Sequence, residues 1–244
     1  MVMKEVITTG FNELDNLLTG LHGGDLIVVG GRPAMGKTHF ALDIVNHVAI
    51  GTNIPCLFYS IEMTKKQVER VLTYIGGDET YEKLRNFQAP IHIEDDVTIT
   101  TAELYSMARE YKEEYDIGLI VIDYFQILIG YQIPELGKRA ISEAMADLKK
   151  LAMDLDVPVV VLTQLDRRLE KRDDKRPKLS DLKGTEPICS EADVIMLLYR
   201  DDYYYSPEET TKPNTAEIIV AKNRNGETGT VELGFSKGRF YGKN

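Results

Sequence analysis

The chain has 244 residues, and 29 lysines and arginines stand against 39 aspartates and glutamates, which gives a formal net charge of −10. Hydrophobic residues make up 43% and charged residues 28% of the chain, a globular composition that excludes a disordered tail or a fibre. No apolar stretch approaches the ~20 residues of a bilayer-spanning helix, so a transmembrane protein is excluded.

Short apolar runs alternate with helical patterns along the first two thirds of the chain. Strands are predicted at 24–31, 55–60, 90–94, 117–122 and 157–163. Helices are predicted from about 36 to 50, 65 to 75, 100 to 115 and 141 to 155, with Thr100 or Thr101 as a cap and Glu103 in the first turn. Unbroken apolar strands between helices indicate a parallel sheet covered on both faces.

The last third of the chain has a different pattern. Apolar runs at 193–199, 216–221 and 230–235 follow one another without long helices, and glycines mark a turn before the last run. This indicates antiparallel strands that extend the parallel sheet. The polar stretches 165–187 and 201–215 are predicted to be loops. Since no linker is evident, we expect a single domain over 1–244, with a lead-in segment at 1–23 and a core at 24–235.

Residues 31–38 read GRPAMGKT, which fits the phosphate-binding pattern G-x-x-x-x-G-K-[ST] between a predicted strand and a predicted helix. Glycines at both ends let backbone N–H groups point at phosphate oxygens, and the helix N-terminus adds a favourable dipole. Lys37 is expected to reach the β- and γ-phosphates and Thr38 to bind Mg²⁺. The predicted nucleotide-binding residues are Gly31, Arg32, Pro33, Ala34, Met35, Gly36, Lys37, Thr38 and His39, although packing suits His39 better than a catalytic role.

Three further polar residues follow predicted strands, and the carboxyl ends of parallel strands share one edge of a sheet. Asp123 could hold Mg²⁺, or could merely cap the next element. Glu62 could act as the general base on the attacking water, or could be an exposed loop glutamate. Gln164 could sense the γ-phosphate, or could be a simple strand-end amide.

Two groups of cations lie outside the phosphate loop. Lys222 and Arg224 sit two residues apart after a strand, where they could reach a neighbouring subunit's γ-phosphate. On charge alone, a solvated hairpin tip is the favoured interpretation of this pair. Residues 165–183 carry eight basic and five acidic side chains, which suits either a nucleic-acid contact or a solvated loop of mixed charge.

Several strings occur in an order that resembles the C-terminal motor domain of DnaB-like replicative DNA helicases, from about Thr8 to Phe235. They include GGRPAMGKT, YSIEM, LIVIDYFQIL, LTQLDRRLE, EADVIMLLYRDDYY and IIVAKNRNGETG. The resemblance implies a RecA-like P-loop NTPase fold. It also implies a homohexameric ring with ATP and Mg²⁺ between subunits, and 5′-to-3′ movement on single-stranded DNA. Possible partners are then a primase and a helicase loader.

The resemblance also implies roles for single residues. Lys37 and Glu62 match catalytic positions of the phosphate loop and the general base, and Asp123 matches the metal-binding aspartate. Gln164 matches the sensor that links ATP to DNA. Lys222 and Arg224 match cations supplied in trans to the neighbour's ATP. The family's DNA-tracking loop matches near 181–183, so that Lys183, Gly184 and Thr185 are the expected DNA-binding residues.

Two features depart from the family pattern. Only about 23 residues precede the first core strand, where the family carries a helical N-terminal domain and a linker helix. The DNA-tracking loop reads KGTEP, in which Lys183 offers a point charge where the family more often has arginine. A RecA-like recombination or regulatory ATPase that forms rings or filaments without unwinding is the alternative function, and a non-catalytic scaffold is a third. The two cysteines and the absence of a signal peptide favour a cytoplasmic location, in a bacterium or for a phage protein in its host.

Overall fold

The computed structural model describes residues 6–123, 125, 137–182 and 185–243. In these residues the chain forms a sheet of nine strands in the order β3-β2-β4-β5-β1-β6-β7-β8-β9. The strands are β1 (Leu26–Gly31), β2 (Cys56–Ser60), β3 (Ile91–Glu94), β4 (Leu119–Asp123), β5 (Val159–Gln164), β6 (Val194–Arg200), β7 (Thr215–Asn223), β8 (Gly229–Ser236) and β9 (Arg239–Gly242). The first six strands in the spatial order pair in parallel, and β7, β8 and β9 extend the sheet as antiparallel strands. This confirms the predicted fold class, including the antiparallel tail.

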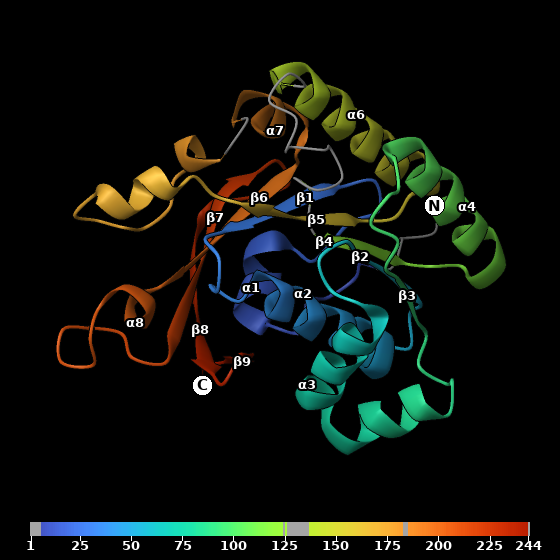
Figure 1. Cartoon of the computed structure of the whole chain (residues 1–244), viewed down its shortest axis with the longest axis horizontal. Helices are drawn as coiled ribbons and strands as arrows, with labels where there is room; N and C mark the ends of the chain where they lie inside the picture. The colour runs from blue at the N-terminus through green and yellow to red at the C-terminus, as the bar shows by residue number, and fades with distance from the viewer. Residues whose placement is uncertain (1–5, 124, 126–136, 183–184, 244) are drawn as a thin grey trace.

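Helices cover both faces of the sheet, with α1, α2 and α3 on one face and α4, α6 and α7 on the other (Figure 1). The helices are α1 (Asn12–Leu18), α2 (Lys37–Asn46), α3 (Lys65–Arg85), α4 (Thr101–Tyr115), α6 (Gly137–Leu155), α7 (Thr185–Glu191) and α8 (Asp201–Tyr204). Each face has its own hydrophobic core, because strand residues alternate between the two sides. Strands buried on both sides therefore read as unbroken apolar runs in the sequence.

Several helices differ from the predicted bounds. The α-helical part of α2 ends at Asn46, and a π-helical turn occupies His47–Gly51. Helix α3 continues to Arg85 across a kink at Gly77, whose φ of 68° lies in the left-handed region that glycine tolerates. Thr100 caps α4 as expected, since its Oγ1 accepts a hydrogen bond from the Glu103 backbone N–H at 3.2 Å.

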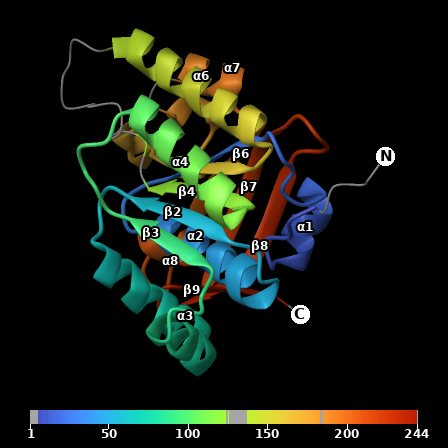
Figure 2. The same ribbon diagram turned by 90° about the vertical axis from the view of Figure 1, so that its right-hand side faces the viewer.

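The hydrophobic core also draws on residues outside 24–235. Helix α1 lies in the predicted lead-in, and its Leu14 and Leu18 are fully buried. The Phe11 ring stacks on Phe40 of α2 with 5.6 Å between ring centroids. At the other end of the chain, β9 contributes the buried Phe240, and Figure 2 shows β8 beside α1. No helix among residues 6–123, 125, 137–182 and 185–243 combines the length and hydropathy of a membrane span.

Candidate nucleotide-binding site

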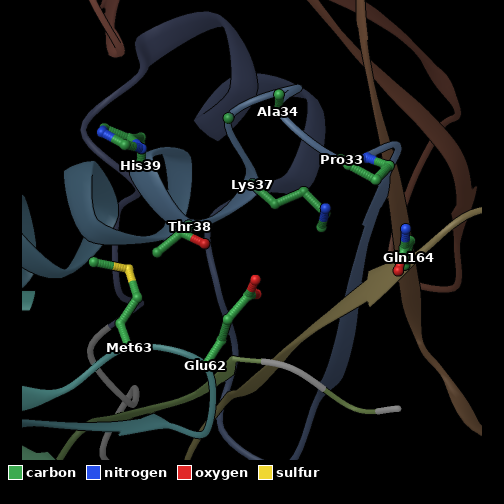
Figure 3. A pocket seen from close by; sticks show the side chains of 9 residues that line it. Pro33, Ala34, Lys37, Thr38, His39, Glu62, Met63 and Gln164 are labelled. Atoms are coloured by element: carbon green, nitrogen blue, oxygen red, sulfur yellow. The ribbon is translucent and has the colours of Figure 1, made fainter. Parts of the chain in front are cut away.

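A cavity of about 310 Å³ opens at the edge where β1, β2 and β5 end (Figure 3). Its lining residues come from the phosphate loop, from the turn after β2 and from the end of β5. They are Pro33, Ala34, Gly36, Lys37, Thr38, His39, Glu62, Met63 and Gln164. The structure thus brings together most of the residues that the sequence predicts for nucleotide binding, in the position where parallel sheets bind ligands.

Aromatic side chains of the C-terminal strands β8 and β9 pack against the phosphate loop. Gly36 precedes α2 with a φ of 98°, a left-handed conformation that disfavours any side chain. A Cβ at this position would meet the Phe240 ring at 3.0 Å. Arg200 stacks on the Phe235 ring at 3.8 Å and donates a hydrogen bond from Nη1 to the Ala34 carbonyl at 3.4 Å. These contacts support the curled conformation of the loop.

Lys37 leaves α2 at its first residue and lies along the loop. Its Nζ donates a hydrogen bond to the Arg32 carbonyl at 3.3 Å. Burial lowers the pKa of Lys37, while the negative charges of Asp123 and Glu62 oppose that shift. Figure 3 shows Lys37, Thr38 and Glu62 directed into the same space, so a polyphosphate there would meet a cation and a hydroxyl beside a carboxylate.

Asp123 ends β4 and lies beneath the phosphate loop with 1% of its surface exposed. Its Oδ2 accepts a hydrogen bond from the Thr38 Oγ1 at 2.6 Å. Burial raises the pKa of Asp123 to about 6, and the nearby Glu62 charge adds to the shift, whereas Thr38 and Lys37 oppose it. A buried carboxylate beside a hydroxyl therefore lacks a full counter-charge, and this pair of hard oxygen donors fits Mg²⁺.

Magnesium commonly takes one or two protein oxygens and completes its shell with water and phosphate. In the part of the chain that the structure describes, no cluster of three or more His, Cys, Asp or Glu side chains could hold a metal ion by itself. The Thr38–Asp123 pair matches a magnesium site with two protein oxygens, at which a nucleotide would supply further ligands.

Glu62 enters the cavity from the turn between β2 and α3. Two hydrogen bonds between Ser60 and Met63 hold this turn, with the Ser60 Oγ donating to the Met63 carbonyl at 2.7 Å. The Ile61 backbone N–H also donates to the Asp123 carbonyl at 2.7 Å. Glu62 itself stays exposed to solvent. The carboxylate is thus fixed at its base and open to water, which suits a general base.

Gln164 ends β5 and pairs in register with Gly31, the first residue of the phosphate loop. Arg32 connects the same two segments, because its Nη1 donates to the Leu165 carbonyl at 2.9 Å and its Nε to Glu170 at 2.7 Å. The predicted nucleotide ligand Arg32 is therefore engaged with the segment that follows β5. The end of β5 and the phosphate loop are thus connected by strand pairing and by the Arg32 side chain.

Lys222 and Arg224 lie near the amino ends of the parallel strands β6 and β1, whereas the cavity lies at the carboxyl ends of the parallel strands. β7 runs antiparallel to β6, so the end of β7 is paired with the start of β6 at Asn223 and Val194. The phosphate loop follows the far end of the neighbouring parallel strand β1, and six strand residues span roughly 20 Å. The structure thus does not bring these two cations to the cavity of their own chain.

Both cations contact the connection between α7 and β6 instead. The Lys222 Nζ donates hydrogen bonds to the Cys189 carbonyl at 2.6 Å and to the Ala192 carbonyl. Arg224 donates from Nη1 to Asp193 Oδ1 at 3.1 Å and from Nη2 to the Ser190 carbonyl. The hairpin tip is therefore an ordered structure with specific contacts.

The stretch 165–187, predicted to be a loop, contains two 3₁₀ turns and the start of α7. Three of its described cations form ion pairs within the chain, Arg168 with Asp166 at 3.1 Å, Arg172 with Asp181 at 2.9 Å and Arg176 with Glu217 at 2.8 Å. Arg167, Arg168, Lys171 and Lys178 remain exposed. Of the expected DNA-binding residues, Lys183 and Gly184 lie outside the described residues, and so does the side chain of Thr185 at the start of α7.

Comparison with known proteins decides the family. The family model described as DnaB-like helicase C terminal domain matches residues 6–241. The chain belongs to this family. Among relatives of the DnaB-like family, the replicative DNA helicase DnaB of Geobacillus stearothermophilus is 39% identical over 250 residues, covering 95% of this chain and 55% of the relative. The replicative DNA helicase DnaC of Bacillus subtilis is 38% identical with the same coverage.

Solved structures of related proteins share the fold. One solved ATPase domain is 32% identical with a TM-score of 0.86, covering 98% of this chain and 92% of that one. A DnaB-like replicative helicase, solved in a study of its interactions with primase, has the same identity and TM-score and is covered to 62%. A KaiC-like protein of Pyrococcus horikoshii, at 17% identity and a TM-score of 0.72, shares the RecA-like fold. This DnaB-like chain spans about half the length of the curated relatives it matches.

Proposed function

We propose that this chain is the motor of a replicative DNA helicase, which hydrolyses ATP at the interfaces of a hexameric ring and moves 5′ to 3′ on single-stranded DNA to unwind duplex at replication forks. The observation that carries the proposal is the separation of two half-sites. Lys37, Thr38, Glu62 and Gln164 line one cavity, whereas Arg224 lies at the other edge of the same sheet.

The residues of the cavity divide the work of ATP hydrolysis. The phosphate-loop N–H groups and Lys37 bind the phosphates, and the rigid loop orients the chain of phosphates for in-line attack. The Glu62 carboxylate orients the attacking water and accepts its proton. The Gln164 amide contacts the γ-phosphate and reports its loss to the segment after β5. Thr38 and the Asp123 carboxylate would hold Mg²⁺, which when bound would neutralise charge that develops on the phosphates.

Arg224 and Lys222 complete the site of a neighbouring copy. They cannot serve their own chain's cavity, because the length of the sheet separates them from it. A contact between two different faces of one protein is heterologous, and repeated contacts of this kind close into a ring when the rotation allows. Such an arrangement couples hydrolysis in one subunit to the position of the next, and an arginine supplied in trans accelerates phosphoryl transfer by roughly 10³–10⁵.

DNA contact and partners are drawn from the family. Lys183, Gly184 and Thr185 are the residues that we expect to track the DNA backbone in the ring channel, through phosphate contacts that carry no sequence information. A helicase relative of known structure was studied with primase, and we extend that partner, together with a helicase loader, to this chain. Because the curated relatives are bacterial proteins, we expect this chain to act in the cytoplasm of a bacterium, or of a phage's host.

Unwinding of a forked duplex tests the proposal. The expected result is ATP-dependent strand separation on a fork with a free 5′ tail and none on a duplex with only a 3′ tail. Lys37→Ala is the matched negative control. DNA-stimulated ATP hydrolysis without unwinding on either substrate would refute the helicase assignment and favour a RecA-like recombination or regulatory ATPase.

A further inference from the structure

Asp193 lies between α7 and β6 and joins three parts of the fold. Its Oδ2 accepts hydrogen bonds from the Leu26 backbone N–H at 2.8 Å and from the Lys149 Nζ of α6 at 2.6 Å. Its Oδ1 accepts a hydrogen bond from the Arg224 Nη1 at 3.1 Å. Only 7% of the Asp193 side chain is exposed. Both carboxylate oxygens are therefore used, and one of them is directed at the guanidinium.

The backbone fixes Asp193 and Arg224 in the same frame. The Asp193 N–H donates to the Leu26 carbonyl at 2.8 Å, and the Arg224 N–H donates to the Asp193 carbonyl at 2.9 Å. Burial raises the pKa of Asp193, but hydrogen bonds from Lys149, Leu26 and Arg224 outweigh it, so the net pKa lies below its usual value. The Asp193 carboxylate, fixed by the backbone just before β6, thus contacts the guanidinium of Arg224.

Arg224 keeps donors available while it contacts Asp193. A guanidinium has five N–H donors in a planar fork, and the Asp193 and Ser190 contacts use one on each terminal nitrogen. The side chain is 46% exposed. The remaining donors can reach outward to a phosphate without loss of the Asp193 contact, and Asp193 holds the plane of the fork in one orientation.

We propose that Asp193 is a positioning residue, which orients the Arg224 guanidinium toward the ATP of the neighbouring subunit. The inference rests on the proposed function of Arg224 in trans. A long side chain that is already ordered loses less rotamer freedom when it engages the transition state. Asp193 therefore supports turnover without touching the nucleotide of either subunit.

A double-mutant cycle in steady-state ATP turnover tests this role, with Asp193→Asn, Arg224→Ala and the double variant measured at saturating ATP and at high protein concentration. Asp193→Asn is expected to lower kcat by roughly tenfold to a hundredfold, the scale of a misplaced catalytic group, with nucleotide binding unchanged. In the Arg224→Ala background the same substitution should have no further effect. Asp25→Asn is the matched control, because Asp25 lies beside Asp193 but contacts Asn225 rather than Arg224.

Each result of the cycle has a distinct meaning. An equal loss in both backgrounds would show that Asp193 supports the fold rather than Arg224, and a gain in kcat would show that it holds Arg224 back. Either result overturns the inference. Wild-type turnover of Arg224→Ala at every protein concentration would instead overturn the proposed function.

A second variant, Asp193→Glu, separates a loss of positioning from a loss of folding. Asp193→Glu keeps the charge for Lys149 and moves the carboxylate outward by one methylene, so it should also lower kcat. All assays are run at a temperature where thermal melts show each variant folded. A folded Asp193→Glu with wild-type kcat contradicts the positioning role.

Discussion

The ion pair between Arg176 and Glu217 should stabilise the fold and contribute nothing to DNA binding. The Glu217 side chain is 4% exposed, and its two oxygens accept hydrogen bonds from Arg176 Nε and Nη2, both at 2.8 Å. Removing one partner of a buried ion pair costs about 3–5 kcal/mol. Because Lys212 also contacts Glu217 at 2.7 Å and Arg176 is partly exposed, we expect Arg176→Ala to cost about 2–3 kcal/mol.

For a chain of this size that loss lowers Tm by roughly 4–12 °C, which calorimetry measures directly. Burial raises the pKa of Glu217, but the hydrogen bonds from Arg176 and Lys212 outweigh it and leave the pKa lowered. The stabilisation is therefore present at neutral pH and lost as the pH falls, so the penalty of Arg176→Ala should shrink in acid. Arg168→Ala is the control, because Arg168 is 81% exposed. Equal Tm values for Arg176→Ala and the wild type, or weaker DNA binding by the folded variant, would refute the reasoning.

Three further predictions concern the cavity and its support. Glu62→Gln keeps the shape of the side chain but not its basicity, so ATP turnover should fall about 10²–10⁴-fold while a fluorescent ATP analogue still binds; unchanged turnover contradicts the role. Phe240→Ala empties the space behind Gly36 and should cost about 3–5 kcal/mol in denaturant unfolding; a loss below about 1 kcal/mol contradicts the packing. Burial raises the pKa of Asp43 to about 7, and a hydrogen bond from the Phe240 N–H partly offsets the shift. The stability that Asp43 contributes is therefore full below about pH 4 and is lost as the pH rises through 7. The free energy of unfolding of Asp43→Asn should therefore rise relative to that of the wild type between about pH 4 and 7, by up to about 4 kcal/mol in denaturant titrations. A difference that does not change with pH contradicts this prediction.

The parallel part of the fold was predictable because its physical causes are local. Strands buried on both faces read as apolar runs, as in β1, β2, β4 and β5, and parallel strands require crossover connections, which the helices between them supply. Elements too short for periodicity were missed. Helix α1 has seven residues and strand β9 has four, too few for a periodic pattern, and the rings of Phe11 just before α1 and of Phe240 within β9 pack on the distant Phe40. Helix α7 carries Pro187 in its first turn, which a helix tolerates but a sequence pattern reads as a break.

The candidate site likewise has one part that the sequence predicts and one part that it does not. The phosphate loop is a run of consecutive residues, and strand-end residues such as Asp123 converge because parallel strands share one carboxyl edge. Arg200 and Phe240 were not predicted, since their contacts with Ala34 and Gly36 join residues far apart in the chain. The signal for Arg200 was its place at the end of β6, at the same edge of the sheet. The roles of Glu62, Gln164 and Arg224 stay predictions until they are tested by substitution.

The central claim is that each nucleotide site is built from two copies of the chain, and mixing two inactive variants tests it most directly. Lys37→Ala chains keep Arg224 but lose their own site, whereas Arg224→Ala chains keep the site but lack the arginine. Each variant alone should hydrolyse ATP slowly, and an equal mixture that exchanges subunits should recover up to about a quarter of the wild-type rate, because half of the sites meet half of the arginines. A mixture that hydrolyses ATP no faster than the average of the two variants would contradict the account.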